Sequence, residues 1–143
     1  MSLLADKALE FASIKHRRQL DDQGRPYFFA HIVQVYNILN VVTADETILC
    51  AGILHDVIED TGTSYEELIK EFNREIADLV VELTHIGVKD TGRYFPFLHS
   101  RKAIIVKFAD RLSNISRMDD WPGDWQLDYL NESRFWDTAP QQN

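Results

Sequence analysis

The chain has 143 residues, a normal size for one domain with a buried core, and its 45% hydrophobic and 27% charged residues are ordinary for a globular protein. Its 23 acidic and 15 basic residues give a formal net charge of −8, which argues against a nucleic-acid binder or a membrane-surface binder because both need a positive field. A small anionic ligand is compatible with this charge, since one bound metal ion and a few basic side chains can reverse the potential locally.

The N-terminal segment, MSLLADKALEFA, lacks the basic start and the long apolar run of a signal peptide. No apolar stretch approaches the roughly 20 residues that cross a bilayer, and the single cysteine, Cys50, excludes an internal disulfide. We therefore expect a cytoplasmic protein with no membrane partner and no nucleic-acid partner. Apolar residues at helical spacing predict a first helix over 3–20, and Gly24 and Pro26 predict a turn after it.

Two further apolar helices are predicted next, over about 29–40 and 44–59. Thr43 and Glu46 have the spacing of a capping box, which indicates that the second of these helices begins here. Its residues are mostly Ile, Leu, Ala and Val, and a helix that is apolar on all sides is buried. We therefore expect the helix over 44–59 to lie at the centre of the fold.

Thr63 and Glu66 repeat the capping-box spacing before a run whose apolar residues recur every three or four positions up to Leu83. This run predicts an amphipathic helix that divides near Asn73 into two. Residues 86–100 contain two glycines, a proline and scattered aromatic residues, and we predict a loop there.

The following helix is predicted over 101–117, and its main apolar stripe consists of Ile104, Ile105, Phe108, Leu112 and Ile115. A last helix is predicted after Pro122, and the tail 137–143 is expected to fray. The tryptophans near this end belong either to the core or to an interface of a homo-oligomer; they are Trp121, Trp125 and Trp136. Together these elements predict a single all-α domain over 1–143, a bundle of about six to seven helices.

The most informative stretch is LHDVIEDT, inside the apolar helix 44–59. His55 and Asp56 are adjacent there, and Glu59 and Asp60 follow one helical turn later. Four ionisable groups in six residues would repel one another and lose hydration in a core unless a cation compensates them. The alternative is that Glu59 and Asp60 form the solvated end of a helix.

A second polar group lies in the helix over 101–117, in the stretch IVKFADRLSNI. Asp110 and Asn114 are four residues apart, away from the predicted apolar stripe, which suits a metal ligand with a hydrogen-bonding neighbour. The alternative is a surface pair near Arg111. His31 lies in the apolar run FFAHIVQVYNIL, where a histidine with satisfied hydrogen bonds in the core is the alternative to a metal ligand.

Taken together, His31, His55, Asp56 and Asp110 form a mixed set of nitrogen and oxygen donors on three predicted helices. Such a set suits a divalent ion such as Mn²⁺, Fe²⁺ or Zn²⁺ better than a structural zinc site built from thiolates. Four protein ligands would leave positions for water and a phosphate oxygen in a six-coordinate shell, which is what metal-assisted hydrolysis requires.

The order of these residues, H…HD…D, resembles that of the HD superfamily of metal phosphohydrolases. The stretches FASIKHRRQLDDQGRPYFFAHIVQV, AGILHDVIEDTGTSYEELIKEF, IADLVVELTH and VKFADRLSNI resemble the hydrolase domain of the RelA/SpoT-type alarmone family over roughly 5–117. This resemblance implies removal of the 3′-pyrophosphate from guanosine tetra- and pentaphosphate, with Mn²⁺ ahead of Zn²⁺, Fe²⁺, Co²⁺ or Mg²⁺.

The resemblance also implies roles for individual residues. Glu59 and Asp60 match the acidic pair that positions and activates the attacking water, and Asn114 matches a polar contact near metal and substrate. Five residues are implied or expected to contact a nucleotide substrate or to offset its charge, namely Lys15, His16, Arg17, Lys107 and Tyr129. Solvated surface charge is the alternative interpretation for the lysines and for Arg17.

Three departures from the family pattern bear on the substrate. The stretch QLDDQ stands where basic residues are usual, PYFFAH carries one extra residue before His31, and the loop between Thr84 and Arg101 is short. Two other functions therefore stay open beside alarmone hydrolysis. One is an HD-type nucleotidase acting on a nucleoside monophosphate or a cyclic nucleotide, and the other is a non-catalytic, metal-binding regulatory module, which would have no evident need of Glu59 and Asp60.

Overall fold

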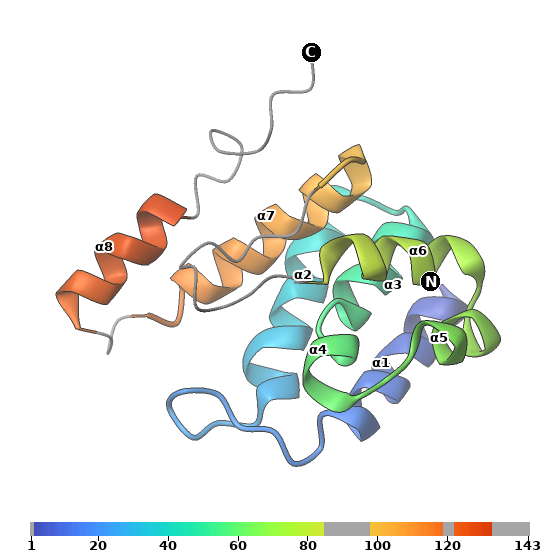
Figure 1. Cartoon of the computed structure of the whole chain (residues 1–143), viewed down its shortest axis with the longest axis horizontal. Helices are drawn as coiled ribbons and strands as arrows, with labels where there is room; N and C mark the ends of the chain where they lie inside the picture. The colour runs from blue at the N-terminus through green and yellow to red at the C-terminus, as the bar shows by residue number, and fades with distance from the viewer. Residues whose placement is uncertain (1, 85–97, 119–121, 133–143) are drawn as a thin grey trace.

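The structure is a computed structural model that describes residues 2–84, 98–118 and 122–132. Within these residues the regular structure is helical, apart from an isolated bridge between Leu20 and Pro26, which confirms the predicted all-α class (Figure 1). The elements are α1 (Leu3–Lys15), the π-helix η1 (Phe28–Ile32), α2 (Val33–Val42), α3 (Glu46–Leu54), α4 (Val57–Thr61), α5 (Tyr65–Glu71), α6 (Arg74–Leu83), α7 (Arg101–Ile115) and α8 (Gly123–Glu132).

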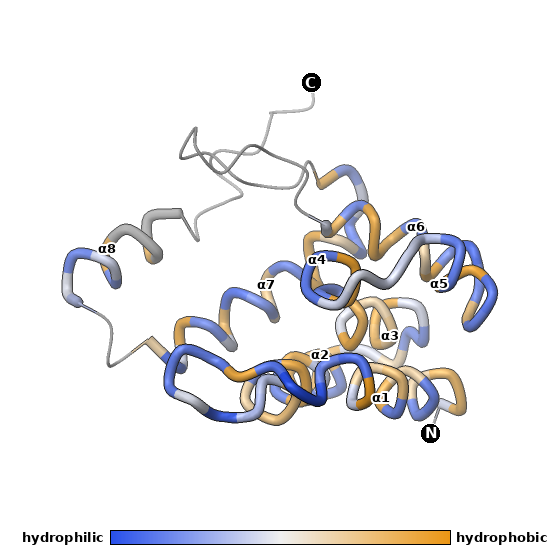
Figure 2. The backbone as a smooth tube through the Cα atoms, turned by 60° about the horizontal axis from the view of Figure 1, so that its bottom comes forward, coloured by the Kyte–Doolittle hydropathy of each residue, from blue (hydrophilic) through white to orange (hydrophobic). Residues whose placement is uncertain are grey.

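Helix α3 lies at the centre of the bundle, as its composition predicts. Every residue from Ile48 to Leu54 is buried, and α3 packs against α1, α2, α6 and α7. The tube in Figure 2 shows that apolar segments of α1, α2 and α3 lie together, whereas α8 stands apart at the far end of α7. Trp125 on α8 is exposed, and Trp121 and Trp136 lie outside the described residues, as do the tail 137–143 and most of the predicted loop 86–100.

The two predicted capping boxes are each displaced. The Asp45 carboxylate, not Thr43, accepts a hydrogen bond from the Ile48 N–H and caps α3, while the Thr43 hydroxyl accepts from the Asp45 N–H in the preceding turn. Ser64, not Thr63, caps α5. The predicted division near Asn73 is confirmed, because the Asn73 side chain caps α6.

Two helices are shorter than predicted. The first ends at Lys15 rather than near residue 20. The predicted helix over 44–59 is interrupted at His55 and Asp56, which separate α3 from α4. The His55 ring donates to the carbonyl of Gly52, three residues earlier, and Asp56 has φ −102° and ψ −2°, at the edge of the helical region. This break turns two polar side chains out of an apolar helix at the same point.

The predicted apolar stripe of α7 is not its buried face. Phe108 and Leu112 are 41% and 53% exposed, whereas Ala103, Val106 and Ala109 are buried. Small residues on this face let α7 lie close to α2 and α3, and the polar side chains of Asp110 and Ser113 are buried with them. The buried face of α7 is polar, and the larger apolar residues lie on the other face. A prediction from hydrophobicity alone therefore assigned the wrong face of α7 to the core.

Most of the stretch PYFFAH forms a π-helix. Residues Phe28–Ile32 form one wide turn, closed by a hydrogen bond from the Val33 N–H to the Phe28 carbonyl, five residues back. Single turns of this kind occur frequently at functional sites. The wide turn leaves His31 and Ile32 buried while Phe29 lies at the surface.

No helix in the described ranges has the length and apolar character that a bilayer crossing requires.

Gly52 determines how closely α2 approaches α3. A Cβ atom at this position would lie 2.2 Å from Cδ1 of Leu39 and 3.4 Å from Cγ1 of Val35, both on α2. Leu39 is itself fully surrounded, so it has little room to move away. The absence of a side chain at Gly52 therefore keeps the two helices, and the residues that follow them, in register.

We predict that Gly52→Ala lowers the free energy of unfolding by about 1–3 kcal/mol, the usual cost of overpacking a core. Urea denaturation followed by circular dichroism measures this change. Gly123→Ala is the matched control, because a Cβ atom there would meet nothing within 4 Å. Equal stability of Gly52→Ala and the wild type would contradict the close approach of α2 and α3.

Candidate metal centre

Four side chains from three parts of the fold converge in one buried cluster. His31 comes from η1, His55 and Asp56 come from the break between α3 and α4, and Asp110 comes from α7. One ligand atom from each lies within 4.8 Å of all the others. The structure thus brings together the four residues that the sequence predicts as metal ligands, and we call them the His/Asp cluster.

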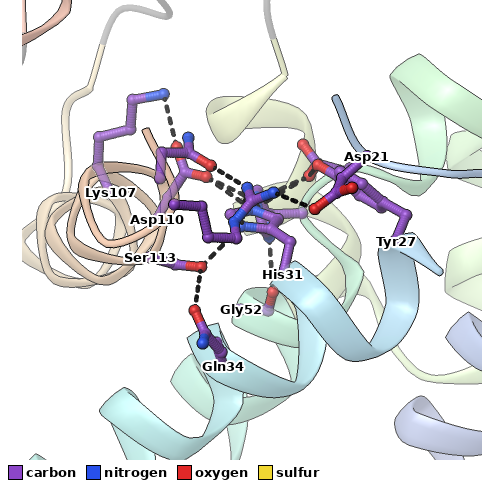
Figure 3. A network of polar contacts seen from close by, with 12 residues as sticks. Asp21, Tyr27, His31, Gln34, Gly52, Lys107, Asp110 and Ser113 are labelled. Carbon is purple, nitrogen blue, oxygen red and sulfur yellow. Dashed lines mark hydrogen bonds and ion pairs between the residues drawn. The ribbon is translucent and has the colours of Figure 1, made fainter. Parts of the chain in front are cut away.

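Short distances join the polar atoms of the His/Asp cluster (Figure 3). The Nε2 atoms of His31 and His55 lie 3.3 Å apart, and Oδ1 of Asp110 lies 3.0 Å from the first and 3.1 Å from the second. Oδ2 of Asp56 lies 3.1 Å from Nε2 of His55 and 3.6 Å from Nε2 of His31. Both histidines are buried, so water cannot screen these contacts.

The hydrogen bond at the back of His55 determines what its Nε2 atom can do. Nδ1 of His55 lies 2.6 Å from the Gly52 carbonyl, which can only accept, so the proton of the neutral ring is on Nδ1. Nε2 then carries a lone pair that faces two carboxylates and a second imidazole. A cation between these atoms removes the repulsion, so this donor set fits a bound divalent metal ion.

The shifts of two pKa values in the cluster agree with a site that favours a positive charge. Burial alone would lower the pKa of His55, but the Asp56 and Asp110 carboxylates outweigh it and hold the pKa well above its usual value. Burial alone would raise the pKa of Asp110, but Lys107 and the two histidines hold it well below its usual value. The carboxylates of the cluster therefore favour positive charge at the His55 ring.

A second set of side chains orients the cluster, and sequence reasoning did not identify it. The Ser113 hydroxyl lies 2.9 Å from Nδ1 of His31 and donates to Oε1 of Gln34 at 3.1 Å. The Tyr27 hydroxyl donates to Oδ2 of Asp56 at 2.5 Å. Such partners fix the orientation of ligating side chains. Helical spacing offered a signal, because Gln34 is three residues after His31 and Ser113 is three residues after Asp110.

One of the two acids in the stretch QLDDQ, Asp21, forms ion pairs at the edge of the cluster, whereas Asp22 is exposed. The Asp21 side chain is only 2% exposed and pairs with Nε of Arg25 at 3.0 Å and NH1 of Arg117 at 3.3 Å. NH2 of Arg117 donates to Oδ1 of Asn114 at 2.6 Å. Asn114 is therefore held beside the cluster by an arginine, which the sequence analysis did not identify.

The predicted catalytic acids lie on α4, directly after Asp56. Glu59 and Asp60 are both exposed, and Oδ2 of Asp60 accepts a hydrogen bond from the Gln19 amide at 3.0 Å. Partial loss of solvation and the charge of Asp56 raise the pKa of Asp60. The two acids are therefore exposed on the helical turn that follows Asp56, a residue of the His/Asp cluster.

The predicted substrate contacts are not brought together. Lys107 is buried, with its Nζ 3.3 Å from Oδ2 of Asp110, whereas Lys15 pairs with Glu67 of α5 at 3.0 Å. Arg17 is exposed, and His16 is buried. The side chain of Tyr129 lies outside the described part of the structure.

We predict that the wild-type protein binds about one divalent ion per chain and that Asp110→Ala binds much less, because the substitution removes a carboxylate that contacts both histidines. Elemental analysis after dialysis measures the metal content. Asp78→Ala, at an exposed site on α6, is the control and should keep the ion. Equal metal content in Asp110→Ala and the wild type would show that Asp110 does not bind the ion. The ion should also raise the thermal stability, since it binds only the folded chain.

Comparisons with known proteins agree with this arrangement. The family model for the HD domain matches residues 8–94. A guanosine-3′,5′-bis(diphosphate) 3′-pyrophosphohydrolase of Borreliella burgdorferi is 34% identical over 81% of this chain, which spans only 19% of that relative's length. The guanosine-3′,5′-bis(diphosphate) 3′-pyrophosphohydrolase MESH1 of Drosophila melanogaster is 30% identical, over 91% of this chain and 78% of the relative.

A solved structure is also similar along the whole chain. It is described as a metazoan ortholog of SpoT that hydrolyses ppGpp, and it matches with a TM-score of 0.78 and 27% identity, over 100% of this chain and 89% of that one. The family model covers more than half of the chain, and the motif resemblance and the fold agree with it. The chain therefore belongs to the HD-domain family.

Proposed function

We propose that this chain is a metal-dependent phosphohydrolase that removes the 3′-pyrophosphate from guanosine tetra- or pentaphosphate or a closely related nucleotide. The observation that carries the proposal is the buried His/Asp cluster, which is followed on α4 by two exposed acids, Glu59 and Asp60. The names of the Borreliella and Drosophila relatives support the choice of substrate. A soluble nucleotide substrate is consistent with the cytoplasmic location that the sequence predicts.

The side chains of the cluster would hold the metal ion, for which we propose Mn²⁺. His31, His55, Asp56 and Asp110 offer two nitrogen and two oxygen donors, a combination that suits ions of this class. When bound, such an ion polarises a phosphate oxygen and lowers the pKa of a bound water. Tyr27 and Ser113 keep a carboxylate and an imidazole directed inward, so that little rearrangement is needed when the ion binds.

Glu59 and Asp60 would act on the attacking water. Both follow Asp56 within one turn of α4, so they share a rigid support with a metal-binding carboxylate. The pKa of Asp60 is raised and therefore lies closer to neutral pH than that of an ordinary aspartate. This suits a residue that accepts a proton. A module that only bound metal would not need this exposed pair of acids.

Positive charge for the substrate would come from a few positions. Arg17 is exposed in the turn after α1, and Arg117 lies beside Asn114 and His31. Lys107 compensates Asp110 and adds positive potential from the buried side. The stretch QLDDQ has no arginine or lysine to offer a base, and the nearby Arg25 pairs with Asp21. We therefore expect a loose preference for guanine over adenine, about 10-fold or 1.4 kcal/mol.

We predict that Glu59→Gln retains the metal ion but lowers kcat by about 10²-fold or more, the usual effect of losing an acid–base group. Elemental analysis and steady-state kinetics on the same preparations measure the two properties. Glu66→Gln, at an exposed acid in the first turn of α5, is the matched control and should change neither. Unchanged turnover in Glu59→Gln would show that this residue is a surface acid.

We also predict that guanosine 3′-diphosphate 5′-diphosphate loses its 3′-pyrophosphate as one intact group, and that a chelator stops the reaction. A single positioned water attacks one phosphorus, so the other nucleotide phosphates are retained. Separate assays for pyrophosphate and phosphate distinguish this reaction from others. Release of phosphate from nucleoside monophosphates, without pyrophosphate release from either the guanosine or the adenosine alarmone, would instead support the nucleotidase alternative.

A further inference from the structure

Gln19 lies between a buried histidine and the proposed catalytic acid Asp60. Oε1 of Gln19 is 2.7 Å from Nδ1 of His16, and its Nε2 is 3.0 Å from Oδ2 of Asp60. His16 is only 2% exposed, and within the described structure its Nε2 atom has no hydrogen-bond partner. The burial of His16 makes direct contact with a nucleotide an unsuitable role for it, although the family resemblance implies that role.

The chemistry of the three groups determines the direction of both hydrogen bonds. A carboxylate can only accept, so the amide nitrogen of Gln19 must face Asp60. The amide oxygen then faces His16, and it can only accept, so the His16 proton must be on Nδ1. His16 therefore prevents the Gln19 amide from turning over, and Gln19 in turn holds one oxygen of Asp60.

The backbone of Gln19 is fixed as well. Its N–H donates to the His16 carbonyl at 2.9 Å, and its carbonyl accepts from the Tyr27 N–H at 2.9 Å. Tyr27 also donates its hydroxyl to the Asp56 carboxylate. The segment from His16 to Tyr27 thus holds two carboxylates of the α4 region, one in the His/Asp cluster and one exposed on α4.

We propose that Gln19 is a positioning residue for Asp60 and that His16 fixes the Gln19 amide for this purpose. The proposal rests on the function proposed above, in which Asp60 orients the attacking water. Gln19 is neutral, so it directs the carboxylate without the strong loss of basicity that an arginine or lysine partner would cause. With Oδ2 held by Gln19, Oδ1 of Asp60 is left to accept a hydrogen bond from water.

The first test measures the His16 tautomer by ¹⁵N NMR and does not depend on activity. The wild type should show the proton on Nδ1, and Gln19→Leu should lose this preference because the acceptor is gone. Gln19→Glu keeps an acceptor for His16 while it removes the donor to Asp60, so it should retain the Nδ1 proton. A wild-type proton on Nε2 of His16 would overturn the proposed hydrogen bonds from His16 through Gln19 to Asp60. This outcome does not depend on which substrate the enzyme hydrolyses.

The second test is a double-mutant cycle with the alarmone as substrate. Gln19→Leu and Gln19→Glu should each lower kcat by about 10-fold, the effect of losing one hydrogen bond to a charged group, with KM and metal content unchanged. In the Asp60→Asn background, neither substitution should lower kcat further. Equal losses with and without Asp60 would show a general structural role and overturn the proposal.

Gln23→Leu is the matched control for both tests. Gln23 lies in the same turn, and its amide donates to the Arg117 carbonyl rather than to Asp60. It should therefore leave both the His16 tautomer and kcat unchanged. If the wild type does not hydrolyse the alarmone, the proposed function fails, and the tautomer measurement still decides whether the His16–Gln19 contact exists.

Discussion

The structure depends on one electrostatic conflict, the convergence of two imidazole nitrogens and two carboxylates at the centre of a helical bundle. Nε2 of His31 and Nε2 of His55 lie 3.3 Å apart, and Oδ1 of Asp110 contacts both. Such groups repel one another in a low-dielectric interior unless a cation lies between them. The surrounding fold keeps them together, because η1, the α3–α4 break and α7 are each anchored by apolar contacts of their own.

Gly52 links the packing of the bundle to the chemistry of the cluster. Its missing side chain lets α2 lie close to α3, and its carbonyl accepts the proton of His55. Gly52 therefore affects both the distance between α2 and α3 and the choice of the His55 nitrogen that faces the cluster. The break at His55 and Asp56 follows from the same contact, since a side chain rather than the next turn of helix approaches this carbonyl.

Sequence periodicity was sufficient for the all-α class, for the central place of α3 and for the division at Asn73. It failed on α7, where the buried face carries Asp110 and Lys107 among small residues and is therefore less hydrophobic than the exposed face. Motif spacing predicted which four residues would meet, because their types and order are unusual for a core. It did not reveal the roles of Gln19, Tyr27 or Arg117, because their contacts with Asp60, Asp56 and Asp21 join segments far apart in the chain.

The distance along the chain between the cluster residues also has a consequence for folding. Ser113 and His31 are 82 positions apart, so the cluster joins the beginning of the described chain to α7, near its end. Contacts of this kind close large loops, and the chain entropy lost on closure is offset only once the contacts have formed. The seven helical elements described before α7 carry most of the buried apolar residues, so they can bury much of their apolar surface before α7 docks. An ion that binds only the closed cluster would then stabilise the last step of assembly, so the lifetime of the native state should depend on metal concentration more strongly than the rate of initial collapse does.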